Sequence, residues 1–139
     1  MVTAESCGWA CGRMRAMRDV LPVLAFLLIL TACGSRQLER EAAARTGGHP
    51  AKGSGLILKY GCNACHLIPG APEPRTPVGP PLAGLARRVY LAGAVANRPQ
   101  NLILWIRDPQ AVVRGTAMPN LGVTDQDGRD IAAYLYTLR

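Results

Sequence analysis

Three residues of this 139-residue chain, Cys62, Cys65 and His66, have the types and spacing of a covalent cofactor site. Two thiols three positions apart on a tight helical turn can each form a thioether to a vinyl group of one porphyrin. The histidine that follows directly then lies under the ring, where an imidazole nitrogen can bind the iron. The Cys-x-x-Cys-His spacing therefore predicts a single covalently attached haem c.

A bare pair of cysteines at this spacing has two other readings, a redox dithiol or half of a zinc site. A zinc site needs a second pair of ligands, and the chain after Cys33 offers none. A thioredoxin-like dithiol needs a βαβ context, whereas the flanks here are helical in pattern and interrupted by Gly and Pro. The added histidine therefore favours haem over both alternatives.

A second axial ligand for the iron can be sought among the methionines and the other histidine. The chain contains Met1, Met14, Met17 and Met118, and its second histidine is His49. Met118 stands in a short apolar loop between two predicted helices, where its thioether can approach the ring face opposite His66. Methionine in such a loop is more often core filler, but the need for a sixth ligand favours ligation by Met118. His49 remains the alternative ligand.

The N-terminal third reads as a targeting segment. Arg13, Arg15 and Arg18 precede the apolar run 20–30, which is shorter than the roughly 20 residues needed to span a bilayer. A charged region followed by a short apolar region is typical of a secretory signal. We expect a signal peptide over residues 1–32, with Met14 or Met17 as a possible true start.

The apolar run ends in Leu30-Thr31-Ala32-Cys33-Gly34, which resembles a bacterial lipoprotein signal. That resemblance implies cleavage before Cys33, a lipid on Cys33, and a place on the periplasmic side of a bacterial membrane. Residues 33–50 are predicted to be the lipidated Cys33 and a flexible linker with a reach of about 20–25 Å, in which Gly47 and Gly48 break any transient helix over 36–45. The folded domain is then expected over residues 51–139.

Helical patterns dominate this domain and predict an all-α fold. The first helix is expected over 51–60, with Gly61 as its stop, and a proline-rich loop follows over 69–81. Further helices are expected over 82–91 and over 101–107. The last helix begins with a capping box at Thr124 and carries an apolar stripe at helical spacing, made of Ile131, Tyr134, Leu135 and Leu138.

Two glycines of the first helix, Gly53 and Gly55, carry a packing prediction. Glycine lowers helix propensity, so its presence suggests that another helix crosses closely at this point. We expect Gly53 or Gly55 to lie where the first helix meets the face of the last helix that bears Tyr134 and Leu135.

From about residue 51 to 139 the chain resembles a class I cytochrome c. The resemblance rests on the Cys-x-x-Cys-His segment, on Gly79-Pro80-Pro81-Leu82, on the Trp105 segment ending in Asp108-Pro109, on Thr116-Ala117-Met118-Pro119 and on the last helix. It implies short helices wrapped around one haem, with the N- and C-terminal helices crossing. It further implies that the Pro80 carbonyl accepts the His66 imidazole N–H, that Arg88 lies near the propionates, and that Trp105 lies against the haem.

The expected function follows from the two axial ligands. A His/Met pair leaves no open iron position, so the predicted protein is a non-enzymatic one-electron carrier between respiratory-chain components. A terminal oxidase or a quinol–cytochrome c oxidoreductase would be its partner. Alternatives are a haem subunit of an oxidase or sulfur-oxidising complex, and a haem peroxidase or ligand sensor. The net charge of +7 favours acidic partner proteins, and no basic stripe with stacking aromatics points to nucleic acid.

Overall fold

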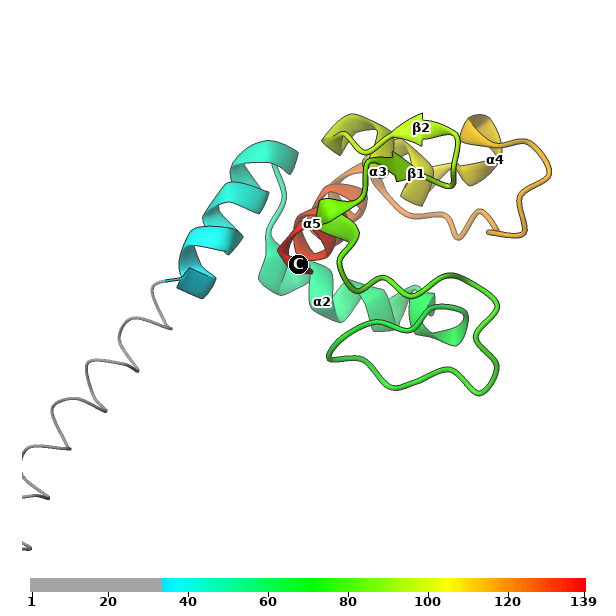
Figure 1. Cartoon of the computed structure of the whole chain (residues 1–139), viewed down its shortest axis with the longest axis horizontal. Coiled ribbons are helices and arrows are strands. Elements are labelled where there is room, and N and C mark those ends of the chain that lie inside the picture. Colours follow the sequence, from blue (N-terminus) through cyan, green and yellow to red (C-terminus); the bar gives the residue numbers. More distant parts are fainter. Residues whose placement is uncertain (1–33) are drawn as a thin grey trace, which may run out of the picture. The chain divides into compact units, whose positions relative to one another are not determined.

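The computed structural model describes residues 34–139, so the predicted signal peptide over 1–32 and the predicted lipid site Cys33 lie outside the described residues. Helices make up most of the regular structure, which confirms the predicted all-α class (Figure 1). No helix within residues 34–139 is both long and apolar enough to cross a membrane. After a helix whose described part covers 34–46, the elements are α2 (Pro50–Lys59), η1 (Cys62–Ala64), η2 (Leu85–Arg87), β1 (Tyr90–Leu91), β2 (Val95–Ala96), α3 (Pro99–Arg107), α4 (Pro109–Val112) and α5 (Asp125–Thr137).

The centre of the domain is the crossing of α2 with α5. A Cβ atom added at Gly53 would lie 2.0 Å from the backbone oxygen of Asp130 and 2.8 Å from the Cβ of Tyr134. The close crossing predicted from the glycines is therefore confirmed for Gly53, whereas a Cβ at Gly55 would have no neighbour within 4 Å. The absence of a side chain at Gly53 lets the two backbones approach, and the apolar sides of the helices are buried as a result.

The buried core lies between α2, α3 and α5 and includes most of the apolar stripe predicted for the last helix. Ile131 and Leu135 of that stripe are buried, and Tyr134 and Leu138 pack against the core while remaining partly exposed. Tyr134 also donates a hydrogen bond from its hydroxyl to the Pro69 carbonyl at 2.7 Å, tying the proline-rich loop to α5. The largest fully buried side chains are those of Ile57, Leu102, Ile131 and Pro109.

The start of α2 is capped by a buried carboxylate of α5. Asp130 is 2% exposed and accepts hydrogen bonds from the His49 backbone N–H at 2.8 Å and from the Gln126 amide at 2.9 Å. Helix α2 therefore begins against α5, with Pro50 in its first turn. It ends before Gly61, whose φ of +68° is the left-handed conformation expected of a glycine stop.

Only one of the two hydrogen bonds of the predicted capping box forms at the start of α5. The Asp127 backbone N–H donates to the Thr124 hydroxyl at 3.1 Å. The Asp127 carboxylate instead accepts from the Tyr60 hydroxyl at 2.6 Å and from Lys59 Nζ at 3.3 Å, both on the C-terminal end of α2 or just after it. The Tyr60 hydrogen bond, and then Lys59, hold the pKa of Asp127 below its usual value. The second contact predicted from sequence is thus replaced by a bond between helices.

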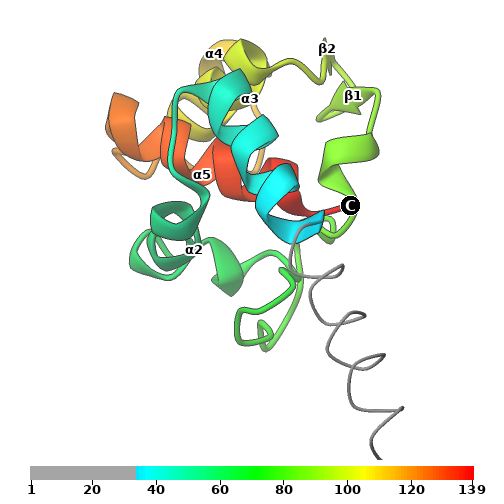
Figure 2. The ribbon, with the colours of Figure 1, turned by 90° about the vertical axis from the view of Figure 1, so that its left-hand side faces the viewer.

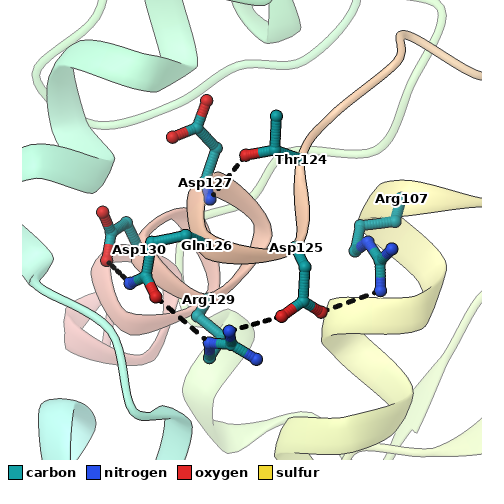
Figure 3. A network of polar contacts seen from close by, with 7 residues as sticks. All are labelled: Arg107, Thr124, Asp125, Gln126, Asp127, Arg129 and Asp130. Atoms are coloured by element: carbon teal, nitrogen blue, oxygen red, sulfur yellow. Dashed lines mark hydrogen bonds and ion pairs between the residues drawn. The ribbon is translucent and has the colours of Figure 1, made fainter.

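A polar network ties the first turn of α5 to α3 (Figure 3). Asp125 lies between two guanidinium groups, with Arg107 Nη1 at 2.8 Å from one carboxylate oxygen and Arg129 paired with the other. These side chains are more than a third exposed, so each pair adds little to stability. Their effect is to fix how α3 lies against the beginning of α5.

The segment predicted as a flexible linker over 33–50 is helical over residues 34–46, which corrects the prediction for the described part. We name it the leading helix (Figure 2). From Leu38 onward it belongs to the same compact unit as the rest of the domain. Ala42 is 3% exposed and is part of the core. An Ala-rich run has high helix propensity, and burial of Ala42 then holds the helix on the domain.

Charged side chains and two glycines complete the docking of the leading helix. Arg139 pairs with Glu41 at 3.0 Å, and the Arg45 guanidinium lies 4.5 Å from the centre of the Tyr136 ring. A Cβ at Gly48 would lie 2.2 Å from the Arg129 backbone oxygen. Gly47 and Gly48, which were predicted to break a transient helix within the linker, therefore form a tight connection that lies against α5.

The helix predicted over 82–91 does not form. Gly84 adopts φ +68°, only Leu85–Arg87 forms a 3₁₀ turn, and Tyr90 and Leu91 pair antiparallel with Ala96 and Val95. Asn97 holds this segment, because its amide donates to the carbonyls of Leu85 at 2.8 Å and Arg88 at 2.9 Å. The competing tertiary bonds made by Asn97 outweigh the weak helical pattern.

Candidate haem-binding site

The three residues with the strongest sequence signal stand at the exit of α2. After the left-handed Gly61, η1 (Cys62–Ala64) forms a tight turn in which the backbone N–H groups of Cys65 and His66 donate to the Cys62 carbonyl at 3.3 and 3.1 Å. This turn is the local geometry predicted for attachment of two thioethers to one ring. Both cysteines are free thiols and partly exposed.

The environment of the thiols disfavours the two alternative readings. Burial raises the pKa of the Cys62 thiol, and this disfavours the thiolate, the form used by redox dithiols and zinc sites. Among residues 34–139, no group of three or more His, Cys, Asp or Glu side chains is placed to hold a metal ion. The raised pKa thus disfavours thiolate chemistry at Cys62, and the absence of further ligands among the described residues disfavours a zinc site.

His66 is held in the tautomer that can bind iron. Its Nδ1 lies 2.7 Å from the Pro80 carbonyl oxygen, the contact that the resemblance predicted for Pro80. Because a carbonyl can only accept, Nδ1 carries the proton, and Nε2 keeps its lone pair for a metal. A hydrogen bond of this kind orients a ligating imidazole and raises its basicity. The residues present thus fit a haem bound through Nε2.

Gly79 explains how the ring of His66 is kept in place. A Cβ at this position would lie 2.4 Å from Cε1 and 2.5 Å from Nδ1 of the imidazole, so only glycine leaves room for it. The Gly79 N–H donates to the Cys65 carbonyl at 2.9 Å, and the Leu82 N–H donates to the Leu67 carbonyl at 2.8 Å. The loop is therefore tied back to the histidine at two points. Sequence reasoning noted Gly79 only as part of a motif and missed this steric role.

The two candidates for the sixth ligand occupy different parts of the domain. Met118 is half-buried in the loop between α4 and α5. His49 is exposed and caps the beginning of α2, whereas Cys62 follows the end of that helix. A ten-residue helix is about 15 Å long, so His49 is remote from the turn that holds His66. The fold therefore favours Met118.

Arg88 makes contacts that the sequence did not predict, whereas no such contact is seen for Trp105 within residues 34–139. The Arg88 guanidinium donates to the carbonyls of Pro81 and Ala83, so it braces the loop that follows Pro80. Trp105 is half-buried on α3. The predicted placement of Arg88 near the propionates and of Trp105 against the haem stays a prediction.

Comparison with known proteins supports the same assignment. Residues 50–139 match the family model described as cytochrome c. The chain belongs to the cytochrome c family. Membership implies a covalently bound haem c and a role in electron transfer. The matched region begins at the first residue of α2, so the leading helix lies outside it.

One curated relative of this cytochrome is cytochrome c oxidase subunit 2 of Alkalihalophilus pseudofirmus (strain ATCC BAA-2126 / JCM 17055 / OF4). The two are 32% identical over 89 residues, which cover 63% of this chain and 25% of the relative. The similarity thus concerns about a quarter of the oxidase subunit. No solved structure matches the chain.

Proposed function

We propose that this cytochrome is a membrane-tethered carrier that passes single electrons between respiratory-chain components through one haem c. The observation that carries the proposal is the His66–Pro80 hydrogen bond of 2.7 Å, which prepares Nε2 as an axial ligand. When bound, haem supplies an iron that alternates between the ferrous and ferric states. Cys62 and Cys65 would attach the haem, and His66 and Met118 would ligate its iron.

The proposed ligand pair determines what the protein does with that iron. If both His66 and Met118 ligate the iron, no position would be open to oxygen or to a substrate. A thioether ligand also raises the reduction potential relative to a second histidine. The protein then needs to supply only orientation and electrostatics, which is the task of a carrier and not of an enzyme.

The similarity to an oxidase subunit supports a terminal oxidase as the electron acceptor of this cytochrome. About a quarter of a protein named cytochrome c oxidase subunit 2 is similar to this chain. The second candidate function is therefore that this chain is itself a haem subunit of an oxidase complex. The net charge of +7 suits an acidic docking surface on either kind of partner.

Electron transfer to an oxidase can be measured directly. The reduced cytochrome, mixed with membranes that contain a terminal oxidase, should be reoxidised rapidly at low salt and more slowly as ionic strength rises. A stable complex that copurifies with oxidase subunits would favour the subunit alternative. Rapid carbon monoxide binding to the reduced wild-type protein, together with no reoxidation by the membranes, would contradict the carrier function and support a ligand sensor or peroxidase.

The proposed tether is a lipid on Cys33, placing the domain on the periplasmic side of a bacterial membrane. Cys33→Ser removes the thiol to which the lipid would be attached, so the protein is expected either to appear in the soluble fraction or to accumulate unprocessed. Fractionation followed by mass spectrometry of the N-terminus measures both results. Cys11→Ser, a substitution of a cysteine within the predicted signal, is the matched control and should leave fractionation unchanged. Membrane association that persists in processed Cys33→Ser protein would show that another anchor is used.

A further inference from the structure

The carboxamide of Gln110 bridges the loop that carries Met118. Its Oε1 accepts from the Gly115 backbone N–H at 2.9 Å. Its Nε2 donates to the Thr116 carbonyl at 2.9 Å and lies 3.4 Å from the Met118 carbonyl. One side chain thus contacts the backbone of the loop both before Met118 and at Met118 itself.

Gln110 is itself fixed by the short helix in which it stands. It is the second residue of α4 (Pro109–Val112), directly after Pro109, which is fully buried. Asp108 caps this helix, because its carboxylate accepts the Ala111 backbone N–H at 3.2 Å. The buried proline and the cap hold the backbone of Gln110 against the core, so its exposed carboxamide reaches the loop from a fixed stretch of backbone.

The loop has few other means of holding its shape. Gly115 adopts φ +79°, and Thr116 donates its N–H to the Val113 carbonyl at 3.2 Å. The Met118 N–H has only a long contact of 3.4 Å to the hydroxyl of Thr116. Within residues 50–139, Gln110 is the one side chain from outside the segment 113–119 that hydrogen-bonds to the backbone of that segment. Its loss would leave the loop held mainly by its own turns.

We propose that Gln110 is a positioning residue that holds Met118 where its thioether can ligate the haem iron. The inference rests on the proposed ligation by Met118. The amide suits this task because it offers an acceptor and a donor in one planar group, and the Gly115 N–H and the Thr116 carbonyl need one of each. Without the amide the loop has more conformations available, and the fraction of molecules with sulfur on the iron falls.

The decisive variant is Gln110→Glu in the full-length protein with covalently attached haem. It keeps the side-chain length and the acceptor for Gly115, but at neutral pH it places an oxygen where Nε2 met the carbonyls of Thr116 and Met118. Loss of the donated bonds should shift the ligation equilibrium about tenfold toward the dissociated form. We expect a weaker charge-transfer band of sulfur-ligated ferric haem, a lower midpoint potential, and faster carbon monoxide binding to the reduced protein.

Gln100 provides a matched control. It is the second residue of α3, directly after Pro99, and it is exposed, so Gln100→Glu introduces the same charge at the same position of a helix. This variant should keep the wild-type band, potential and carbon monoxide kinetics. If Gln110→Glu does not fold, Gln110→Ala removes the bonds without adding charge and is judged by the same three measurements.

The outcomes separate this inference from the proposed function. If wild type shows the sulfur band and Gln110→Glu or Gln110→Ala keeps it at full strength with wild-type carbon monoxide kinetics, the positioning role is wrong and Met118 ligation stands. A variant that loses only thermal stability, with the band and potential unchanged, would likewise overturn the inference. If wild type itself lacks the band and binds carbon monoxide rapidly, ligation by Met118 is wrong and the inference falls with it.

Discussion

Replacing Met118 by alanine is expected to lower the midpoint potential and to open the sixth iron position while haem stays covalently bound. Attachment depends on Cys62 and Cys65, which the substitution leaves untouched. A water ligand stabilises ferric iron better than a thioether does, so the potential must fall. The sulfur charge-transfer band should vanish, carbon monoxide binding should appear, and reoxidation by oxidase-containing membranes should fail.

His49→Ala is the matched control for this experiment, because His49 is the alternative ligand and caps the far end of α2. It should keep the wild-type absorption spectrum and potential. The proposed ligation would be contradicted if Met118→Ala kept the wild-type spectrum. Loss of the low-spin spectrum in His49→Ala would then assign the sixth ligand to histidine.

Gly53→Ala is expected to destabilise the domain through the crossing of α2 and α5. The added methyl group would lie 2.0 Å from the backbone oxygen of Asp130, and a backbone atom cannot move aside as a flexible side chain does. The two helices must separate, which typically costs about 1–3 kcal/mol. For a domain of this size such a cost lowers the melting temperature by about 4–8 °C for each kcal/mol.

Gly55→Ala makes the same chemical change in the same helix where there is open space within 4 Å. It should raise the free energy of unfolding by about 0.5–1 kcal/mol, because alanine restricts the unfolded chain and favours helix. Urea unfolding of both variants, followed by circular dichroism, measures the opposite signs. Equal effects of the two substitutions would show that helix propensity, and not the crossing, determines the outcome.

The parts of this fold that sequence predicted are those with local physical signals. Helix α2 is marked by Pro50 and Gly61, and α5 by Thr124 and its apolar stripe, so their positions and their crossing could be inferred. The attachment turn was predicted from the close spacing of Cys62, Cys65 and His66. The contact between His66 and Pro80 came from the resemblance to class I cytochromes c, and the structure contains that contact.

The parts that sequence missed depend on partners far away in the chain. The leading helix has a helical composition, but its stability comes from burial of Ala42 and from contacts such as Arg45 with Tyr136. The segment after Pro81 has a helical sequence pattern, but Asn97 holds two of its carbonyls in another conformation. No bias in composition and no periodicity in the sequence marks the role proposed for Gln110. In each case a tertiary contact determines the local structure, and no local sequence pattern predicts that contact.

The crossing of α2 and α5 also determines the order in which the domain can be completed. The contact between the first and last helices of residues 50–139 closes a loop over every other element of that domain, so it cannot form until α5 has been synthesised. Because the chain is synthesised from its N-terminus, Cys62, Cys65 and His66 are present well before α5 exists. A prosthetic group can therefore meet these three residues on a chain in which the crossing has not yet formed.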